Sequence, residues 1–351
     1  MKIAIIGDTH WGNKNDSPVF YDYFNRCYEW IFETLDKHNV VDVIQVGDMF
    51  DRRKFINFKT LYEARETFLQ RLNSGFNTYA IVGNHDVFYK NTNKVNSLDL
   101  LLGEFKNIKV NSNKPMTVNI AGIDVDMYPW ITEDNYSECV EYAATKNNSK
   151  VAVGHFEFAN FELYKGRLAD HGMNHKIFER YDVVFSGHYH THSVKDNIVY
   201  TGIPYELMWS DWSDQKGIVL LDTETLQWEF VPNPISLFTK VYYDDSESVP
   251  STEFLNITGK YVKLVVSRKT NIEAYEKFFD ALMRQEPLDL KVVEESVQAA
   301  IDDVEDAKLE FDDTPTLMET FVDGLDEIDL EKPVLKNMLR NLYTEANTFK
   351  I

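Results

Sequence analysis

Five apolar stretches of this chain end in the same way, with a glycine followed by side chains that can bind a metal ion. Each stretch has the length and composition of a short buried strand. In an open α/β sheet, ligands collect at the carboxyl ends of the strands, so we expect the five endings to lie together. Glycine suits these positions because it lets the chain turn sharply and approach other backbone closely. The endings are GDTH (7–10), GDMFD (47–51), GNHD (83–86), GHFE (154–157) and GHYH (187–190).

Strands and helices alternate over the first part of the chain. Residues 2–6, 42–46 and 77–82 are typical of buried strands, whereas 19–38 and 59–73 carry apolar side chains at helical spacing. This order predicts a layered α/β architecture. Further strands are expected at 107–111, 115–120, 122–128, 150–154, 182–186, 198–202, 217–222 and 226–231, with a short helix near 97–105.

Two prolines, Pro232 and Pro234, mark the end of this large part. Beyond them, 260–267, 271–285 and 289–293 predict a strand, a helix and a strand, which is a second and smaller α/β unit. An acidic stretch with few large apolar residues then precedes two short amphipathic helices. We therefore predict a first domain over 1–235, a small domain over 236–293, a linker over 294–313 and a helical tail over 314–351.

The net charge of −21 argues at first sight against a protein that binds nucleic acid. Much of this charge is local, because residues 294–331 hold fifteen acidic side chains and one lysine, a net charge of −14. The remaining chain carries only −7, so nucleic acid stays open as a ligand.

Cysteine usage and hydropathy indicate the cellular compartment. Cys27 and Cys139 are too few and too far apart for a disulfide framework or a cysteine-bound zinc site. The chain has no apolar run of about eighteen residues, the length that would predict a membrane-spanning helix. Its first residues, MKIAIIGDTH, are typical of a strand rather than of a signal peptide. We expect a cytoplasmic protein with no membrane partner.

The strand ends offer oxygen and imidazole donors but no thiolate, which suits manganese or iron, with zinc or cobalt possible. Two ions that share a bridging carboxylate would use this many donors and could hydrolyse a phosphoester. A single aspartate after glycine is usually a turn residue, and a single buried histidine usually belongs to the core. Five of the nine histidines fall at these strand ends, however, so we favour a metal centre. The eight candidate donors are Asp8, His10, Asp48, Asn84, His85, His155, His188 and His190.

The five blocks occur in the order D-x-H, G-D, G-N-H-[DE], G-H and G-H-x-H, which resembles the calcineurin-like metallophosphoesterase superfamily. Within it, QVGDMFDRRK, IVGNHDVFYKN, YPW and TGIPYELMW are similar to the SbcD/Mre-type nucleases of DNA-break repair, most of all those of T-even-type bacteriophages. The resemblance implies a layered sandwich with a small DNA-binding capping domain and a helical tail. It also implies a two-metal DNA exonuclease and endonuclease, acting 3′ to 5′ on duplex ends in recombination and double-strand-break processing.

The resemblance also assigns roles to individual residues. One ion would be held by Asp8, His10, Asp48 and His190, and the other by Asp48, Asn84, His155 and His188. His85 would protonate the leaving 3′ oxygen, with Asp86 as its natural orienting partner. Asp51 stands where archaeal and eukaryotic relatives carry a histidine, and we expect it to support the centre without binding metal. The expected ions are Mn²⁺, with Mg²⁺ as a possible substitute.

The basic side chains and the family resemblance together predict DNA and protein partners. Basic side chains beside two of the loops are expected to contact DNA phosphates, although a solvated loop would look the same; they are Arg52, Arg53, Lys54, Lys90 and Lys94. The resemblance implies an SMC-like ATPase of the SbcC/Rad type, docked on the helices of the tail. It also implies a homodimer, for which Tyr62, Phe68, Leu98 and Leu101 are candidate contacts.

Two other functions remain open at this point. A phosphoprotein phosphatase or a cyclic-nucleotide phosphodiesterase could use the same metal site, but neither needs the additional domain, tether and tail. A metal-bound scaffold without activity would be expected to have a broken donor set, and all eight donors are present here.

Overall fold

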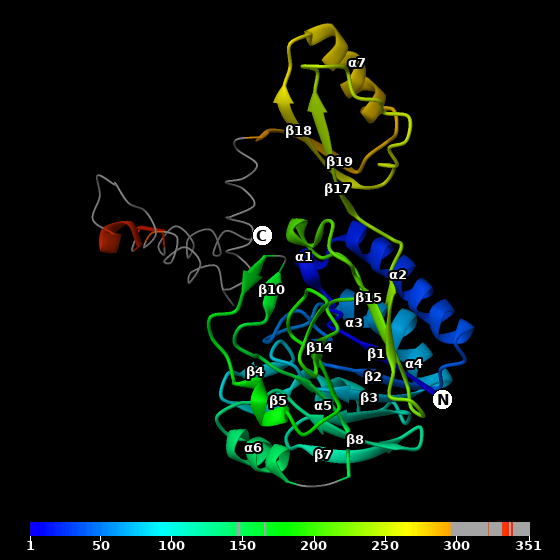
Figure 1. Cartoon of the computed structure of the whole chain (residues 1–351), viewed down its shortest axis with the longest axis vertical. Coiled ribbons are helices and arrows are strands. Elements are labelled where there is room, and N and C mark those ends of the chain that lie inside the picture. The colour runs from blue at the N-terminus through cyan, green and yellow to red at the C-terminus, as the bar shows by residue number, and fades with distance from the viewer. Residues whose placement is uncertain (146–147, 165, 296–321, 323–331, 337, 340–351) are drawn as a thin grey trace. The chain divides into compact units, whose positions relative to one another are not determined.

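The computed structural model describes residues 1–145, 148–164, 166–295, 322, 332–336 and 338–339. The chain divides into two compact units after Thr239 (Figure 1), and each is described by itself. The predicted acidic linker lies outside the described residues apart from its first two positions. Most of the predicted helical tail also lies outside them.

The first sheet holds the strands that lead to three of the glycine-led loops. Its order is β16–β15–β1–β2–β3–β6, in which β1, β2, β3 and β6 run parallel and β15 runs antiparallel to both of its neighbours. β1, β2 and β3 are buried on both faces beyond their first residue, which explains their mainly apolar sequences, whereas Lys109 of β6 is exposed. The strands are β1 (Lys2–Ile6), β2 (Asp42–Gln45), β3 (Asn77–Ile81), β6 (Ile108–Asn111), β15 (Gly217–Asp222) and β16 (Trp228–Pro232).

The second sheet leads to the other two loops. Its order is β13–β14–β12–β9–β8–β7, with β8, β9, β12 and β14 parallel and the edge strands β7 and β13 antiparallel to their neighbours. Its strands are β7 (Met116–Ile120), β8 (Ile123–Tyr128), β9 (Val151–His155), β12 (Val183–Gly187), β13 (Ser193–Lys195) and β14 (Ile198–Tyr200).

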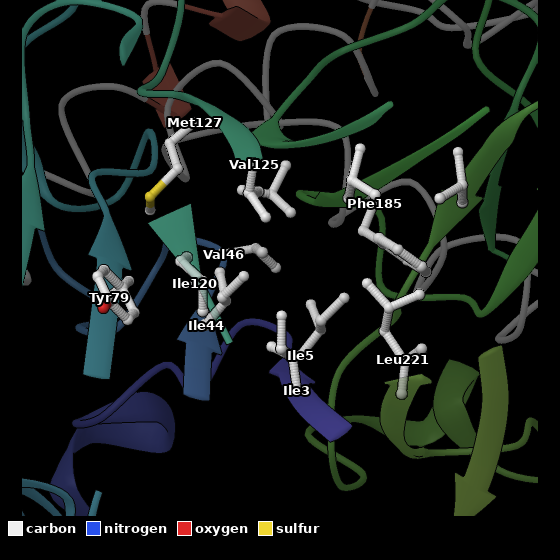
Figure 2. Close-up of a cluster of buried hydrophobic side chains, with 14 of the residues drawn as sticks. Ile3, Ile5, Ile44, Val46, Tyr79, Ile120, Val125, Met127, Phe185 and Leu221 are labelled. Atoms are coloured by element: carbon white, nitrogen blue, oxygen red, sulfur yellow. The ribbon is translucent and has the colours of Figure 1, made fainter. Parts of the chain in front are cut away.

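The main hydrophobic core lies between the two sheets (Figure 2). Alternate residues of each strand point into it, such as Ile3 and Ile5 of β1 and Val125 and Met127 of β8. All four are at most 1% exposed. Burying a side chain of this kind contributes roughly 1.5–3 kcal/mol, so the face-to-face packing fixes how the loops of one sheet meet those of the other.

Helices cover the outer side of the first sheet (Figure 1). The longest, α2 (Pro18–Lys37), starts with a proline in its first turn and buries an aromatic stripe. Next along the layer, α3 (Phe58–Ala64) and α4 (Gln70–Gly75) are joined by a π-helical turn, Arg65–Leu69. This wider turn lets the adjacent Phe68 and Leu69 both point inward. Among the described residues, no helix is both long and apolar enough to cross a lipid bilayer.

Several short elements were not predicted from the sequence. They are too short to show a periodic pattern, or they form only because partner segments lie nearby. They include α1 (Asn13–Asp16), the hairpins β4 (Val87–Tyr89) with β5 (Thr92–Asn96) and β10 (Glu162–Tyr164) with β11 (Arg167–Leu168), β13, α6 (Tyr136–Ala144) and the 3₁₀ turns His175–Phe178 and Trp209–Asp211. The predicted helix at 97–105 is α5 (Ser97–Leu102).

The second unit begins within β17 (Phe238–Asp244), close to the predicted boundary at 235. Its sheet has the order β17–β18–β19, with β18 (Tyr261–Arg268) parallel to β19 (Asp289–Glu294) and α7 (Ile272–Met283) between them in sequence. A separate core supports this unit and contains Val241, Tyr243, Ile257, Val262, Leu264, Phe278 and Leu282. The layered α/β architecture predicted from the sequence is confirmed.

Two of the candidate dimer contacts are corrected by the structure. Phe68 and Leu98 are completely buried within the chain, because the π-helical turn and α5 point them inward. Tyr62 is 62% exposed, and Phe58, four residues earlier on α3, is 90% exposed. Residues four apart share a helix face, so these two side chains form an exposed apolar pair.

Candidate metal centre

The five glycine-led loops meet at the carboxyl edge of the two sheets. Within the second sheet, Gly187 lies opposite His155 in the parallel register of β12 and β9. Across the strands of the first sheet, the main-chain N–H groups of Thr9 and His10 both donate to the carbonyl of Asp48, at 3.1 and 3.0 Å. The predicted convergence of strand ends is therefore present in the fold.

The glycines are required because the loops approach one another more closely than a Cβ atom allows. A Cβ on Gly47 would overlap Nδ1 of His155, which belongs to the other sheet. A Cβ on Gly187 would likewise overlap a carboxylate oxygen of Asp8. Glycine at these positions lets two sheets place their polar side chains in one small volume.

Three of the proposed metal ligands have a backbone conformation that non-glycine residues rarely adopt. The φ angles are 44° at His10, 49° at Asp48 and 88° at His188. Hydrogen bonds hold these conformations, including one from the His188 main-chain N–H to the Asp8 carboxylate at 3.0 Å. Strained backbone of this kind is concentrated at functional sites, where the surrounding structure determines it.

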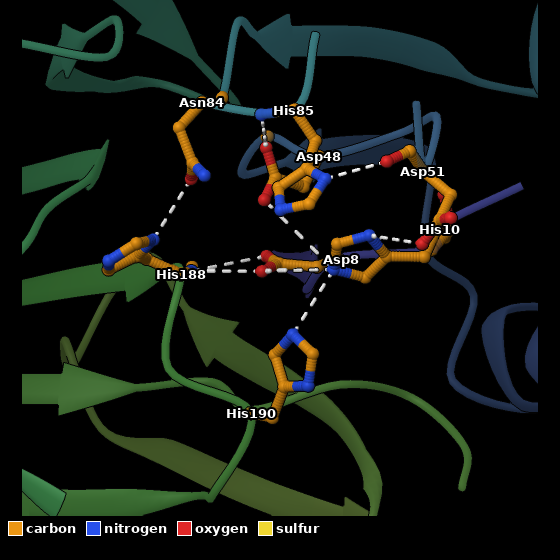
Figure 3. Close-up of polar contacts among 12 residues, drawn as sticks. Asp8, His10, Asp48, Asp51, Asn84, His85, His188 and His190 are labelled. Atoms are coloured by element: carbon orange, nitrogen blue, oxygen red, sulfur yellow. Dashed lines mark hydrogen bonds and ion pairs between the residues drawn. The ribbon is translucent and has the colours of Figure 1, made fainter. Parts of the chain in front are cut away.

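One group of donors consists of Asp8, His10 and His190 (Figure 3). The Nε2 atoms of His10 and His190 are 3.1 Å apart, so one proton or one shared cation lies between them. The same His10 nitrogen is 3.9 Å from a carboxylate oxygen of Asp8 and 4.0 Å from one of Asp48. These four side chains are the ones assigned to the first ion.

A second group consists of Asp48, His155 and His188, with Asn84 beside them. His155 Nδ1 lies 2.7 Å from the carbonyl of Val46, which can only accept, so Nδ1 carries the proton. Its Nε2 faces two oxygen atoms, Asn84 Oδ1 at 2.8 Å and Asp48 Oδ2 at 3.3 Å. Once Nε2 has lost its proton, three electron-rich atoms are directed at one point, which is what a cation requires.

The residues present fit two divalent ions. In each group, the ligand atoms lie within 4.8 Å of one another, and Asp48 Oδ2 is close to both groups. The donors are imidazole nitrogens and carboxylate or amide oxygens, a set used by Mn²⁺, Fe²⁺ and Zn²⁺. Two bound ions would supply Lewis-acid chemistry by lowering the pKa of water and offsetting charge on a phosphate.

His85 is attached directly to this centre. Its main-chain N–H donates to Asp48 Oδ1 at 2.7 Å, and its ring packs edge-on against His10 with centroids 5.0 Å apart. His85 Nδ1 donates to the main-chain carbonyl of Asp51 at 2.6 Å. Nε2 is left as the nitrogen that can exchange a proton.

The expected partnership between Asp86 and His85 is corrected. The Asp86 carboxylate accepts from the main-chain N–H groups of Gly83, Met49 and Phe50, at 3.0, 3.4 and 3.3 Å. These bonds join the second and third glycine-led loops. The Asp86 carboxylate is therefore occupied by main-chain hydrogen bonds and does not bind His85. The group that orients the His85 ring is the Asp51 carbonyl.

Burial and charge shift the pKa values of the donors in opposite directions. Burial disfavours charged imidazoles, but neighbouring carboxylates outweigh it and raise the pKa of His10 and of His155 to about 9. Burial raises the pKa of Asp8 to about 7. It also holds the pKa of His190 well below the usual range, together with the charge on His10. His190 is therefore the neutral acceptor in the His10–His190 pair.

Metal uptake is expected to release protons. His10 and His155, with pKa values of about 9, are charged at pH 7 in metal-free protein, and both must lose a proton to bind metal. Affinity for Mn²⁺ should therefore rise from pH 6 to pH 9 and level off above it. Calorimetry at pH 7 in buffers of different ionisation enthalpy should show at least one proton released per chain. Uptake without proton release would contradict this protonation pattern.

The predicted DNA-binding side chains have different surroundings. Arg52 donates to the Asp16 carboxylate at 2.9 Å and to the Gly12 carbonyl at 3.0 Å, so it braces the first loop. Lys94 forms an exposed ion pair with Asp134 at 3.3 Å. Arg53 is half-buried, whereas Lys54 and Lys90 are exposed. Lys54 and Lys90 are therefore better placed than Arg52 to contact a ligand.

Three further residues near the centre were given no role from the sequence, although Trp130 lies in the YPW motif and Glu157 in GHFE. The buried Lys216 ammonium donates to the main-chain carbonyl of His190 at 2.9 Å and is held by two aspartates. Glu157 lies 3.7 Å from Nε2 of His188, and the Trp130 ring packs against His155 and His188. Glu157 directly follows a candidate ligand motif and could have been found, but an isolated lysine before a strand carries no local signal.

Loops of this composition on two packed sheets define a phosphoesterase. Residues 1–192 match the calcineurin-like phosphoesterase family, and the chain belongs to this family. It is also 32% identical over 347 residues to exonuclease subunit 1 of Enterobacteria phage T4, with 99% of each chain covered. A solved structure of an archaeal phosphodiesterase aligns with 66% of this chain and 100% of its own, at 16% identity and a TM-score of 0.34, too low to bear on the fold. The predicted family and enzyme class, a metal-dependent phosphoester hydrolase, are confirmed.

Proposed function

We propose that this protein is a nuclease that hydrolyses DNA phosphodiester bonds with two divalent ions, preferably Mn²⁺, and degrades duplex ends from 3′ to 5′. The observation that carries the proposal is the position of Asp48 between two groups of donors, with His85 attached to it. Similarity to a phage exonuclease subunit along nearly the whole chain supports DNA as the substrate.

The protein's own groups would divide the work of hydrolysis. Asp8, His10, Asp48 and His190 would hold one ion, and Asp48, Asn84, His155 and His188 the other. His85, oriented by the Asp51 carbonyl, would hold a proton on Nε2 and give it to the leaving 3′ oxygen.

The proposal is tested with duplex DNA labelled at one 3′ or one 5′ end, incubated with Mn²⁺ or Mg²⁺. Stepwise shortening from the 3′ end with Mn²⁺ is expected. Turnover of phosphopeptides or cyclic nucleotides without DNA cleavage would favour the alternative phosphatase or phosphodiesterase. Bound metal without hydrolysis of any phosphoester would favour a scaffold.

We further propose that Lys54 and Lys90, with contributions from Arg53 and Lys94, contact DNA phosphates. Both lysines are exposed on segments that follow the loops of the metal centre. Replacing both with alanine should reduce the slope of log affinity against log salt by about 2, because each phosphate contact contributes roughly one released counterion. The slope is measured by fluorescence anisotropy with duplex DNA and Ca²⁺ in place of Mn²⁺.

A matched control is available at the other edge of the sheets. Lys2 begins β1 and Lys150 directly precedes β9, so both lie at the amino ends of strands whose carboxyl ends carry the metal centre. Replacing these two lysines with alanine removes the same charge and should leave the slope unchanged. Equal slopes for both double variants and the unmodified protein would refute the assignment.

The protein is also proposed to act in DNA recombination and break repair in the cytoplasm, with an SMC-like ATPase bound to residues 314–351. The similar phage protein is named as a subunit, which supports a partner. Deleting 314–351 should abolish co-purification with the ATPase while leaving Mn²⁺-dependent nuclease activity. Retained ATPase binding would place the contact elsewhere.

Two features of the assembly remain proposals of the same kind. A homodimer would use the exposed Phe58 and Tyr62 of α3 rather than Phe68 or Leu98. The small α/β unit would contribute to DNA binding, as the family resemblance implies.

A further inference from the structure

A cavity of about 510 Å³ opens beside the second group of metal donors. Its lining includes His155 and Glu157, together with Trp130, Tyr136 and Met173. The volume is typical of pockets for a single small ligand rather than for a double helix. The mixture of aromatic, aliphatic and polar lining suits a planar heterocycle with polar edges.

The aromatic wall of the cavity is held rigidly. Trp130 donates its main-chain N–H to Val82 at 2.8 Å, and its carbonyl accepts from the side chains of Asn93 and Asn135 at 2.8 and 3.0 Å. Its ring centroid is 5.3 Å from that of His188. The indole therefore lines the cavity while it packs against two metal ligands, His155 and His188, on a backbone anchored by three hydrogen bonds.

The cavity borders the second group of donors, whereas the ring of the proposed proton donor contacts the first. The His85 ring contacts His10 of the first group and the Asp51 carbonyl, whereas the cavity is lined by His155 of the second group. Figure 3 shows Asn84 and His188 on one side and His10 and Asp51 on the other. A phosphate at the centre whose leaving oxygen faces the His85 ring can place its remaining nucleoside beside the second group, where Trp130 packs on His155 and His188.

We propose that this cavity receives the base of the nucleotide that carries the scissile phosphate, unpaired and stacked against Trp130 and Tyr136; the proposal rests on the nuclease function above. A base inside a duplex is paired and stacked, so a strand end must open by one nucleotide before it is cut. The cavity thereby selects frayed or unpaired ends, and stacking on aromatic rings makes it tolerant of base identity.

The test compares two duplexes that differ only in the last nucleotide of the 3′ strand. One ends in a mismatched thymidine and the other in an abasic tetrahydrofuran residue, so neither has a terminal base pair to open. The unmodified protein should cut the thymidine end with a kcat/KM about 5- to 150-fold higher than that for the abasic end. This ratio corresponds to the stacking free energy of one base on an aromatic ring, about 1–3 kcal/mol. In Trp130→Ala and in Tyr136→Ala, this ratio should fall toward one.

Tyr142→Ala is the matched control, because Tyr142 lies on the same helix α6 but directs its hydroxyl to Thr117 and packs on Tyr128. It should keep the preference of the unmodified protein. The ratio compares two substrates for the same variant, so a smaller fraction of folded protein lowers both rates equally and leaves the ratio unchanged.

An unchanged ratio in Trp130→Ala, or no preference for the thymidine end in the unmodified protein, would overturn the base pocket while leaving the nuclease proposal intact. If the unmodified protein hydrolyses bis(p-nitrophenyl) phosphate but no DNA, the nuclease proposal itself fails and the pocket proposal falls with it.

Discussion

Asp48→Ala is expected to lose both metal ions and to reduce phosphodiester hydrolysis by about 10³-fold or more. Asp48 Oδ2 lies 3.3 Å from His155 and 4.0 Å from His10, so it is the carboxylate common to both groups of donors. Lewis-acid stabilisation of a phosphoryl group is worth several kcal/mol, and each ~1.4 kcal/mol corresponds to a tenfold change in rate. Metal content is measured by mass spectrometry of the protein after dialysis against Mn²⁺.

The control for this variant lies at the other end of the strand that leads to the Asp48 loop. Asp42, at the amino end of β2, accepts a hydrogen bond from Asn77 and is remote from the loops at the carboxyl end. Asp42→Ala should keep both ions and full activity. Asp48→Asn preserves the volume of the side chain but removes its negative charge, so it separates the effect of charge from that of shape. We expect this variant to bind both metal ions weakly. Two ions retained by Asp48→Ala would contradict the shared position of this carboxylate.

His85→Gln is expected to lower kcat by about 10²–10⁴-fold while both ions remain bound. The loss is the contribution of a positioned general acid. His85 binds the Asp51 carbonyl through Nδ1, and a glutamine amide can donate to the same carbonyl without delivering a proton to the leaving oxygen. Rates are measured on DNA and on a substrate whose leaving group is p-nitrophenolate. Because p-nitrophenolate needs no proton, the variant should recover most of the lost rate on that substrate.

The matched control is His38→Gln. His38 ends α2 and lies near Lys2, at the amino end of β1, so it is at the other edge of the sheet. It should change neither rate. If His85→Gln lost its metal, His85 would be a ligand rather than a proton donor. An equal loss on both substrates would show that His85 positions the phosphate instead of protonating the leaving group.

The local pattern of apolar and polar residues predicted most of the strands and the kinds of metal-donor side chain that follow them. Apolar runs such as 2–6 and 42–46 are visible because strands buried on both faces need unbroken hydrophobic sequence. The donors were visible because the carboxyl ends of parallel strands gather at one edge, whatever the rest of the fold. Short hairpins and α6 were missed because nothing periodic marks them.

The sequence also did not reveal contacts of individual side chains with partners far away in the chain, or a local departure from helical periodicity. Asp86 is adjacent to His85 in the chain, but its carboxylate turns to the backbone of another loop. Arg52 lies in a basic run that resembles a DNA contact, yet Asp16 engages it. Phe68 follows an amphipathic helix and is buried by a π-helical turn that the periodicity does not reveal.

By itself, the sequence determined which chemical groups stand at the strand ends, and hence that a phosphoester-hydrolysing metal centre was the function to expect. Only the tertiary structure decided that Asp48 faces both groups of donors, that a main-chain carbonyl orients His85, and that a cavity adjoins His155. The physical reason is that periodicity and turn chemistry act over a few residues, whereas the distance between loops is set by the packing of two sheets against a shared core.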